Sequence, residues 1–406
     1  MTATDDIPNY PFDKSGPLEP PTEWAQLRDM CPVARVRMPS GDEVSLISRY
    51  SDVRAVLTDE RFSRNLTGHS AARLADTEDG GIFSRQTMPD ANSFDGDAHR
   101  RWRRLLSGSF TVKKMERWRP RIEAIANSLI DGMIAKGPPA DLMAEVGLPL
   151  PVGVICSLLG ARAQDKDKFA AWSQISLTLT RYTQAEVDQA RCEFIEYVSA
   201  LVEEKRANPG DDLLSELTQI SDTQDGRLSP GELVGTGMAL LLAGHETTSN
   251  MIGKMTGMLL DERERYEAVI ADPELVPGTV DEVLRMDTNA AIGIPRYLTE
   301  DVEIGGCPVN KGTTVLALMS AANRDSAQFP DPDRFDPYRS NAGQHLAFGA
   351  GPHFCLGQPL GRTMLQVTLG AMTRKLPTLR LRDSASELPM RTGMVGGGFE
   401  NVWVIW

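Results

Sequence analysis

Residues 348–358 read Phe348-Gly349-Ala350-Gly351-Pro352-His353-Phe354-Cys355-Leu356-Gly357-Gln358, and the fold class depends on this stretch. Cys355 is its one plausible nucleophile or metal ligand, and it precedes a helical pattern from about Leu360 to Leu376. A thiol at a helix N-terminus meets free N–H groups and the positive end of the helix dipole, which favour the thiolate. Gly351 and Gly357 carry no Cβ, so the backbone here can approach a flat and bulky group.

Three interpretations of Cys355 follow from these residues. The first is a buried structural cysteine, the usual role of a lone cysteine in an intracellular chain. The second is an axial thiolate on a haem iron. A zinc site through His353 and Cys355 is disfavoured, because no second pair of ligands at zinc spacing appears in the chain.

The spacing Phe348-x-x-Gly351-x-x-x-Cys355-x-Gly357 resembles the haem-binding loop of the cytochrome P450 family, and the resemblance extends from about Tyr10 to Trp406. It implies a single haem-thiolate domain over residues 1–406, mainly α with a smaller β portion, in the cytochrome P450 fold. It also implies that haem b lies between two core helices, with Cys355 as the axial ligand of the iron. The loop residues that the resemblance assigns to cofactor binding are Phe348, Gly349, His353, Cys355 and Gly357.

A second stretch with a clear pattern begins at Ser229-Pro230-Gly231-Glu232. Ser at the N-cap, Pro at N1 and Glu at N3 form a capping box, which predicts a mostly apolar helix reaching roughly Leu260. Inside it, residues 243–248 (Ala-Gly-His-Glu-Thr-Thr) match the family's oxygen-binding motif. A glutamate in so apolar a helix is costly unless it is hydrogen-bonded. The alternative is ordinary packing around a tolerated polar turn.

The resemblance gives this motif a role in oxygen activation. Thr247 can hydrogen-bond back to the Ala243 carbonyl and loosen the helical ladder. Gly244 would leave room beside the iron for dioxygen, and Ala243 and Gly244 would both contact the cofactor. Glu246 and Thr247 would be the catalytic pair, an acid and an alcohol that relay protons.

The run Asp97–Arg104 is basic in an acidic protein. A solvated helix start is the usual explanation of such a run. However, His99 and Arg103 lie at i, i+4 and share one helix face, and the two propionates of a haem need cationic donors when they are buried. The family has a His-x-x-x-Arg pair at this position for that purpose, and the resemblance adds Arg296 and His353 as further propionate donors.

Arg101 and Arg104 point away from this face, and with Lys113 and Lys114 they could form a basic patch. On an acidic protein, such a patch suits an acidic electron donor. The resemblance implies that electrons come from NAD(P)H through a ferredoxin reductase and a ferredoxin.

Glu282-Val283-Leu284-Arg285 places opposite charges at i, i+3. Such a pair is common and weak at a helix surface. Its position between the oxygen-binding helix and the cysteine loop matches the family's Glu-x-x-Arg, in which the pair is buried. In that family the pair is joined by the arginine of a Pro-x-Arg-Phe segment, here Arg334. The expected role of these three residues is structural support of the cysteine loop.

Four segments resemble the parts of the family that form the substrate pocket. Residues 65–95 would be a loop over the haem, and residues 165–205 the mobile helix pair that roofs the pocket. Residues 289–295 would form a wall, and the tail from Met394 to Phe399 a closing hairpin, although its three successive glycines are unexpected there. The side chains expected to line the pocket are Phe83, Met88, Ala291, Ile292, Ile294, Met394 and Val395.

The composition narrows the partners and the location. The 406 residues carry 56 acidic and 43 basic side chains, a net charge of −13, which argues against nucleic acid or an anionic membrane surface as a partner. Five scattered cysteines are typical of a reduced, cytosolic protein. The N-terminus is polar, and no run of about 18 apolar residues occurs. We therefore expect a cytoplasmic, monomeric protein of the bacterial type with no membrane association.

Together the motifs imply a haem-thiolate monooxygenase that hydroxylates or epoxidises a small organic molecule. Their wording resembles that of the actinobacterial members that tailor secondary metabolites. The same motifs also allow oxidative coupling, with C–C or C–N bond formation and no oxygen inserted. A peroxide-driven enzyme is disfavoured by the intact acid–alcohol pair. A non-enzymatic haem sensor is the alternative from another class, and it would need neither a redox partner nor the threonine motif.

Overall fold

The computed structural model describes residues 7–30, 32–66, 71–75, 95–219, 228–290 and 292–406. The helices within these ranges are α1 (Glu23–Met30), α2 (Tyr50–Thr58), α3 (Gly96–Ser107), α4 (Val112–Lys136), α5 (Pro149–Leu159), α6 (Lys166–Ser176), α7 (Gln184–Ala207), α8 (Leu213–Gln219), α9 (Pro230–Asp261), α10 (Arg263–Ala271), α11 (Val276–Met286), α12 (Met319–Ala322) and α13 (Gln358–Lys375). The strands are β1 (Ala34–Arg37), β2 (Glu43–Ile47), β3 (Phe62–Ser63), β4 (Ala140–Asp141), β5 (Ile294–Leu298), β6 (Val302–Ile304), β7 (Cys307–Val309), β8 (Thr314–Ala317), β9 (Arg380–Leu381) and β10 (Trp403–Ile405).

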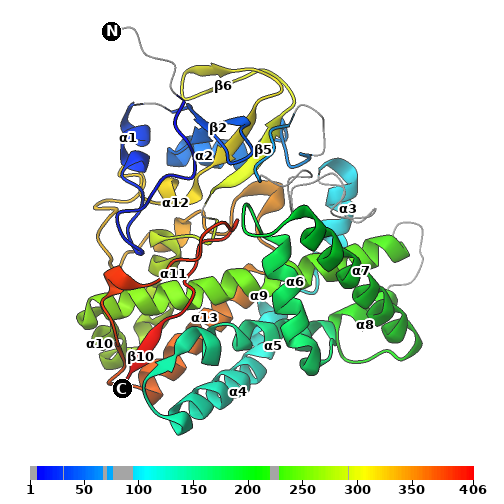
Figure 1. Ribbon diagram of the computed structural model, residues 1–406, viewed down its shortest axis with the longest axis vertical. Coiled ribbons are helices and arrows are strands. Elements are labelled where there is room, and N and C mark those ends of the chain that lie inside the picture. Colours follow the sequence, from blue (N-terminus) through cyan, green and yellow to red (C-terminus); the bar gives the residue numbers. More distant parts are fainter. Residues whose placement is uncertain (1–6, 31, 67–70, 76–94, 220–227, 291) are drawn as a thin grey trace.

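The longest helix, α9, crosses the helical body of the molecule (Figure 1). Its predicted capping box is confirmed: the Ser229 hydroxyl accepts from the Glu232 N–H, and the Glu232 carboxylate accepts from the Ser229 N–H. Helices α5, α7, α10, α11 and α13 pack against it. This packing explains why an apolar sequence forms so long a helix, since burial rather than intrinsic propensity stabilises it.

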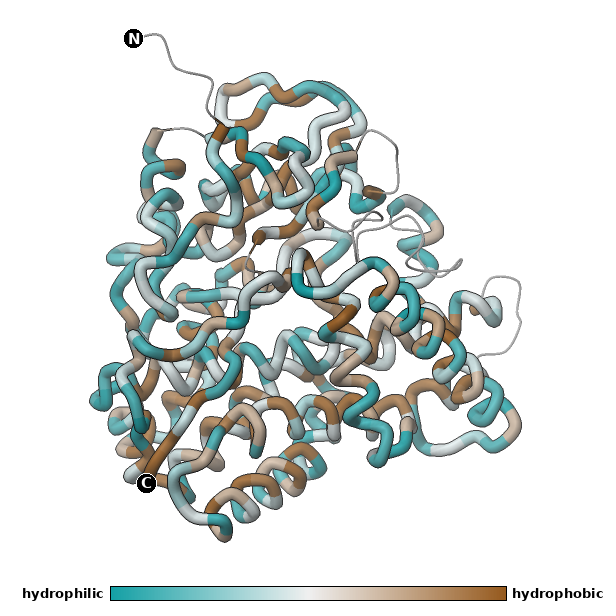
Figure 2. The backbone as a smooth tube through the Cα atoms, viewed as in Figure 1, coloured by the Kyte–Doolittle hydropathy of each residue, from teal (hydrophilic) through white to brown (hydrophobic). Residues whose placement is uncertain are grey.

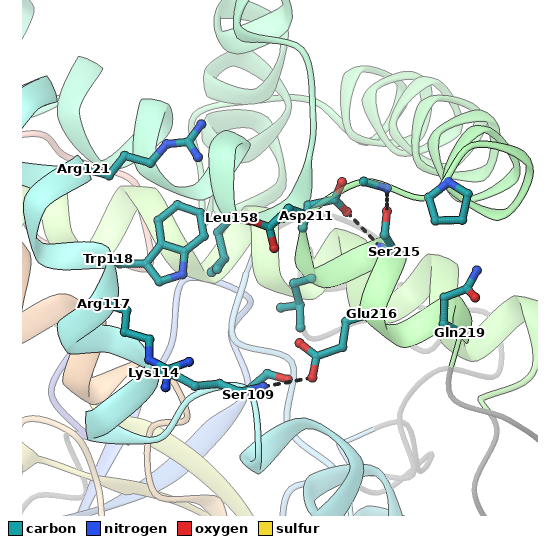
Figure 3. Close-up of a pocket in the computed structure, with 14 residues that line it drawn as sticks. Ser109, Lys114, Arg117, Trp118, Arg121, Leu158, Asp211, Ser215, Glu216 and Gln219 are labelled. Carbon is teal, nitrogen blue, oxygen red and sulfur yellow. Dashed lines mark hydrogen bonds and ion pairs between the residues drawn. The ribbon is translucent and has the colours of Figure 1, made fainter.

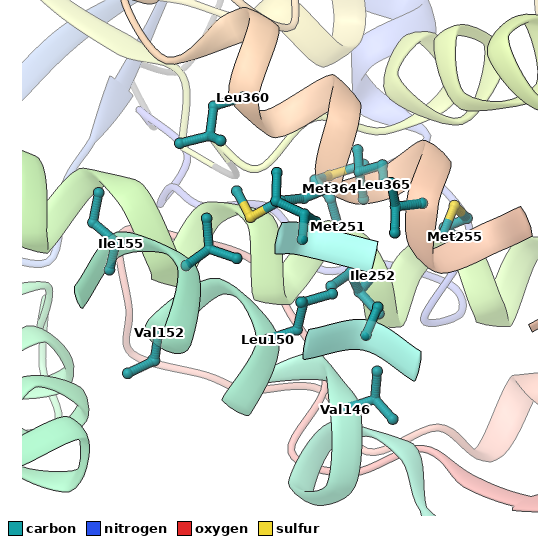
Figure 4. Packing of buried hydrophobic residues seen from close by; sticks show 14 of the residues in the cluster. Val146, Leu150, Val152, Ile155, Met251, Ile252, Met255, Leu360, Met364 and Leu365 are labelled. Atoms are coloured by element: carbon teal, nitrogen blue, oxygen red, sulfur yellow. The ribbon is translucent and has the colours of Figure 1, made fainter. Parts of the chain in front are cut away.

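Side chains from three elements interlock where α5 and α13 meet α9. Ile155 on α5, Met251 and Ile252 on α9, and Leu360 and Met364 on α13 belong to one buried cluster (Figure 4). Each of these side chains is at most 4% exposed. At roughly 1.5–3 kcal/mol for each fully buried large apolar side chain, this cluster holds α9 and the start of α13 in a defined relative position.

A five-stranded sheet forms most of the smaller β portion, at the end of the molecule away from α4 (Figure 1). Its strand order is β1-β2-β8-β5-β3, with β2 parallel to β8 and the other pairs antiparallel. Ile294 pairs with Ala317 and Arg296 with Val315. Residues two apart on a strand share a face, so Ile294 and Arg296 project to the same side of the sheet.

The predicted mainly α fold with a smaller β portion is confirmed. Hydrophobic and hydrophilic stretches alternate along α4 at the lower edge of the molecule (Figure 2), as expected for a helix with one buried face. Within the described ranges, none of the helices combines the length and the apolar character that crossing a membrane requires.

Candidate active site

The cysteine loop ends directly at the start of α13. The Cys355 N–H donates to the Phe348 carbonyl (2.8 Å), which closes the loop, and α13 begins at Gln358. Gly351 has φ +70°, and a Cβ there would lie 2.8 Å from the Leu57 carbonyl oxygen. Gly351 therefore allows the C-terminus of α2 to lie against the cysteine loop. From the sequence, we had explained this glycine by the approach of a flat group.

The Cys355 thiol experiences opposing influences. Burial raises its pKa, whereas the N–H groups of Gly357 and Gln358 and the charge of Arg103 lower it, and the net shift is upward. The predicted stabilisation of the thiolate by the helix start is therefore present, but burial outweighs it in the protein alone. A bound metal ion would deprotonate the thiol outright. Cys355 is an exposed residue, so a ligand can reach this position.

The oxygen-binding motif lies in the middle of α9, where most residues are buried. Ala243 and Thr247 are exposed, whereas Glu246 is buried. The predicted back-bond is present: the Thr247 hydroxyl donates to the Ala243 carbonyl at 3.0 Å. Helix α9 therefore carries two accessible positions, Ala243 and Thr247, and the loop before α13 carries a third, Cys355. Helices α9 and α13 pack together.

Gly244 has a packing role that the sequence did not reveal. A Cβ at this position would lie 2.7 Å from Cδ1 of Ile155 on α5, so the glycine allows α5 to pack closely against α9. Its predicted contact with the cofactor and with dioxygen stays a prediction.

Two histidines meet at one edge of this region. His99 on α3 and His353 in the cysteine loop lie with ring centroids 4.2 Å apart. The His353 Nε2 is 3.2 Å from the Asp95 carboxylate, and its Nδ1 is buried without a hydrogen-bond partner. Burial lowers the pKa of His99 to about 4, and it also lowers the pKa of His353, so both rings are neutral near pH 7.

Three arginines converge on the same edge. Arg296 on β5 is buried, and burial together with the charge of Arg64 lowers its pKa to about 9. Burial also lowers the pKa values of Arg64 and Arg103. Among the described residues, the carboxylate that acts on Arg64 and Arg296 is Asp95, whose pKa is held at about 2 by hydrogen bonds from its neighbours against the opposing effect of burial.

The charges of this cluster fit a group with two carboxylates. Arg64, Arg103 and Arg296 carry three positive charges, Asp95 carries one negative charge, and both histidines are neutral. Two propionates would bring the sum to zero and would compensate the charge of the buried Arg296 and the half-buried Arg103. The cluster therefore fits haem, with Cys355 as the residue that would bind its iron.

Arg64 and Asp95 were not predicted from the sequence. Arg64 directly follows the two-residue strand β3, and Asp95 is the N-cap of α3. Asp95 accepts hydrogen bonds from the Ser63 hydroxyl (2.5 Å) and the Arg64 N–H. No local pattern in the sequence marks either residue, because their role depends on contacts with distant parts of the chain.

The Glu282–Arg285 pair is buried, with both side chains at 0% exposure. The Arg285 Nε and Nη2 donate to the Glu282 carboxylate at 2.7 and 2.8 Å, and its Nη1 donates to the carbonyls of Asn323 and Pro332. The predicted third member is wrong: Arg334 is exposed and contributes its backbone carbonyl. Arg339 takes its place, donating from Nε to Glu282 at 3.1 Å.

The predicted pocket segments lie next to one another where the structure describes them. Thr178, between α6 and α7, bridges to Met394, and Ala290 bridges to Gly396. Met394 and Ile292 are buried, while Val395 and Ile294 are partly buried. The remaining predicted lining residues, Phe83, Met88 and Ala291, lie outside the described residues.

The basic patch is smaller than we predicted. Arg101 forms an ion pair with Glu232 (2.7 Å), and Lys114 forms one with Glu216 (2.9 Å). Arg104 and Lys113 are exposed. These two residues are therefore the members of the patch best placed to meet a charged partner.

A surface groove of about 600 Å³ lies elsewhere, between α4, α8 and the turn before α8. Lys114, Arg117 and Trp118 form one wall, and Asp211 and Glu216 lie opposite (Figure 3). None of the predicted cofactor or catalytic residues lines it, so the groove is separate from the candidate active site.

The comparisons with known proteins agree with this geometry. The family model for cytochrome P450 matches residues 24–395. The chain is 39% identical to the mycinamicin IV hydroxylase/epoxidase of Micromonospora griseorubida, covering 98% of each chain. It is also 39% identical to the nocardicin C N-oxygenase of Nocardia uniformis subsp. tsuyamanensis, covering 97% of each.

Solved structures show the same architecture over the whole chain. The crystal structure of the putative thioether synthase SgvP, involved in a tailoring step of griseoviridin, superposes with a TM-score of 0.92 at 37% identity. The superposition covers 99% of this chain and 100% of that one. The match of the family model, the near-complete relatives and the haem-compatible charge cluster lead to one conclusion: this chain belongs to the cytochrome P450 family and is a haem-dependent monooxygenase.

Proposed function

We propose that this enzyme inserts oxygen from O₂ into a small secondary-metabolite intermediate, by hydroxylation or epoxidation. Its electrons would come from NAD(P)H through a ferredoxin reductase and a ferredoxin. The names of the relatives, which include a hydroxylase/epoxidase of mycinamicin IV and an N-oxygenase of nocardicin C, support this substrate class. The observation that carries the proposal is the exposed Thr247 hydroxyl beside the buried Glu246, on a helix that packs against α13.

Bound haem supplies a redox-active iron at which dioxygen is activated, and an electron-donating thiolate ligand favours cleavage of the O–O bond. Cys355 would provide that thiolate, within a loop framed by Phe348, Gly349 and Gly357. The propionates would be held by the cluster of arginines and histidines at the edge of the site. Arg64, Arg103 and Arg296 would supply the positive charge, and the neutral rings of His99 and His353 would supply hydrogen bonds.

The remaining chemistry belongs to Glu246 and Thr247. The Thr247 hydroxyl donates to the Ala243 carbonyl, so its oxygen keeps free lone pairs on the accessible side of α9. Glu246 is the carboxylate that would take protons from water and pass them to this hydroxyl. Their backbone positions are adjacent in one helix, which keeps the donor and the relay close throughout turnover.

The test compares Thr247→Ala with Thr256→Ala. Thr256 lies on the same helix, and its hydroxyl makes the same bond to the carbonyl four residues back, so it controls for the effect of the substitution on α9. With NADPH, ferredoxin and reductase, Thr247→Ala should still consume oxygen but release it mainly as peroxide. Thr256→Ala should remain as coupled as the wild type. A fully coupled Thr247→Ala enzyme would refute the proton-relay role.

Labelled oxygen decides the reaction type. A monooxygenase product made under ¹⁸O₂ carries the label, whereas oxidative coupling needs oxygen but leaves the product unlabelled. The coupling alternative stays relevant because the solved structure with a TM-score of 0.92 is a putative thioether synthase. A peroxide-driven enzyme would lose little activity in Thr247→Ala when peroxide is supplied, and a haem sensor would show no turnover with the ferredoxin system.

Location and assembly form part of the same proposal. We assign the enzyme to the cytoplasm as a single-domain monomer. The described cysteines (Cys156, Cys192, Cys307 and Cys355) are free thiols, which supports a reducing compartment. Sedimentation of the haem-loaded protein would test the monomer.

A further inference from the structure

A buried ion pair joins the candidate relay acid to the C-terminal part of the chain. The Arg391 Nη1 donates to the Glu246 carboxylate at 2.7 Å, and the two side chains are 11% and 4% exposed. The residues lie 145 positions apart. Charge-assisted hydrogen bonds of this length are among the strong ones, so Arg391 fixes where the carboxylate lies.

Arg391 is the cation that compensates Glu246. The neighbouring His245 donates from Nδ1 to the Leu241 carbonyl (2.8 Å), and its buried Nε2 has no hydrogen-bond partner among the described residues. Burial is the main influence on His245 and lowers its pKa, so this ring is neutral near pH 7. Within the described part of the chain, the ion pair of Glu246 is therefore with Arg391.

The hairpin that carries Arg391 also contacts the segments expected to form the substrate pocket. The Arg391 N–H donates to the Gly398 carbonyl (2.8 Å), which closes the hairpin. The Gly393 carbonyl accepts from the N–H groups of Leu179 and Thr180, in the connection between α6 and α7. On the other side, the Gly397 N–H donates to the Asn289 carbonyl (3.1 Å). A displacement of these segments would therefore move Arg391 as well.

We propose that Arg391 is a positioning residue for proton delivery, which orients the Glu246 carboxylate and links its position to the seating of the 391–398 hairpin against the pocket segments. This inference rests on the proposed monooxygenase function. In it, Glu246 takes a proton from water and passes it toward Thr247, and Arg391 itself neither gains nor loses a proton. When the guanidinium is removed, the carboxylate would lose its orientation and deliver protons less efficiently, so a larger share of the consumed O₂ would be recovered as hydrogen peroxide.

The test uses the haem-loaded, full-length enzyme with a plant-type [2Fe–2S] ferredoxin, its reductase and NADPH. The measured quantity is the share of consumed O₂ that is released as hydrogen peroxide, which requires no knowledge of the natural substrate. Arg391→Gln should raise the ratio of peroxide to water about tenfold, a change expected from the loss of one charge-assisted hydrogen bond. Arg391→Lys, which keeps the charge, should restore part of the coupling.

The control is Arg181→Gln. Arg181 pairs with Glu400 at 3.1 Å, and both side chains are more than 40% exposed. Arg181 connects the segment between α6 and α7 to the C-terminal part of the chain, as the 391–398 hairpin does, but its ion pair is with Glu400 and not with Glu246. Arg181→Gln should therefore keep the peroxide share of the wild type.

A double-mutant comparison separates positioning from a merely structural role. In a Glu246→Gln background, Arg391→Gln should cause no further rise, because both substitutions act on one step. An unchanged peroxide share in Arg391→Gln, or full additivity of the two substitutions, would overturn the inference alone. If Arg391→Gln fails to take up haem, Arg391→Lys takes its place in the comparison. A peroxide share of Arg391→Lys that adds in full to that of Glu246→Gln would then refute the positioning role. A wild-type enzyme that consumes no O₂ with ferredoxin would refute the proposed function itself, and this inference with it.

Discussion

At the scale of single residues, Cys355 is the position that we propose as the ligand of the haem iron. Replacing its sulfur with the Cys355→Ser hydroxyl should abolish the red-shifted Soret band that thiolate-ligated haem shows when reduced and bound to CO. Cys192→Ser is the matched control, because Cys192 is an exposed free thiol on α7. If the Cys355→Ser protein kept the band, another residue would have to be the ligand.

Two of the three glycines at 396–398, Gly396 and Gly398, have a structural reason that the sequence did not reveal. A Cβ at Gly398 would lie 2.2 Å from the side-chain oxygen of Asn250, which is fully buried and donates from its nitrogen to Asn289 (2.8 Å). The amide side chains of Asn250 and Asn289 occupy the space beside the glycine backbone, so any larger residue must displace them.

Gly398→Ala should therefore destabilise the protein by about 1–3 kcal/mol, the usual cost of overpacking a core. Gly370 on α13 is the control, because a Cβ there meets no atom within 4 Å. Gly370→Ala should instead stabilise α13 by roughly 0.5–1 kcal/mol. Thermal unfolding of both variants checks the prediction, and equal effects in the two would contradict it.

At the scale of elements, hydrogen bonds and an ion pair connect the segment after α12 to α11. The Arg339 side chain donates to Glu282 on α11 and to the carbonyls of Asp331 (3.1 Å) and Arg334 (2.9 Å). Glu282 also accepts from the Asp336 N–H (2.9 Å). Arg339 therefore supplies a positive charge, a hydrogen bond to a carboxylate and hydrogen bonds to two backbone carbonyls. Among the described residues, the Arg334 side chain makes none of these contacts.

Arg339→Ala should destabilise the protein by roughly 3–5 kcal/mol, since it leaves Glu282 buried with one cation fewer. Arg334→Ala should change the stability by less than about 0.5 kcal/mol, as exposed substitutions usually do. Denaturant unfolding and haem content measure both effects. A larger loss in Arg334→Ala than in Arg339→Ala would restore the arginine that we predicted from the sequence.

At the scale of the whole molecule, we predict that an electron donor docks on a small positive surface of a chain whose net charge is −13. Arg104 and Lys113 are exposed, whereas Arg101 and Lys114 are partly neutralised by Glu232 and Glu216. Exposed charges mainly affect the rate of association, and salt screens them.

Reversing Arg104 and Lys113 to glutamate should raise the apparent KM for ferredoxin at low salt, with a smaller effect at high salt. Substrate binding, measured by the spin-state change, should stay the same. The control reverses Lys311 and Arg380, which are exposed on other elements, and changes the net charge equally. A ferredoxin dependence that matches the wild type at both salt concentrations would exclude the α3–α4 face as the docking site.

Much of the framework was predictable, because its signals are local. The capping box marked the start of α9, and the helix ends at Asp261, one residue beyond the expected Leu260. The pattern after the cysteine loop placed α13 within two residues of its observed start. Spacing within one turn also predicted the Thr247–Ala243 bond and the i, i+3 contact of Glu282 with Arg285. Such features depend on residues within about one or two helical turns, and the order of residues is enough to define them.

The long-range partners were decided by tertiary packing. Arg339 rather than Arg334 reaches Glu282, and Ile155 packs where a Cβ of Gly244 would lie. Arg64 and Asp95 lie in the same charge cluster as His99 and His353, and Arg391 pairs with Glu246, 145 positions away in the sequence. Each of these contacts depends on how two distant elements approach each other, and several arginines or glycines nearby satisfy the same local pattern. Only the packed structure selects among them, because burial and geometry, not the order of residues, determine which side chain meets the charge.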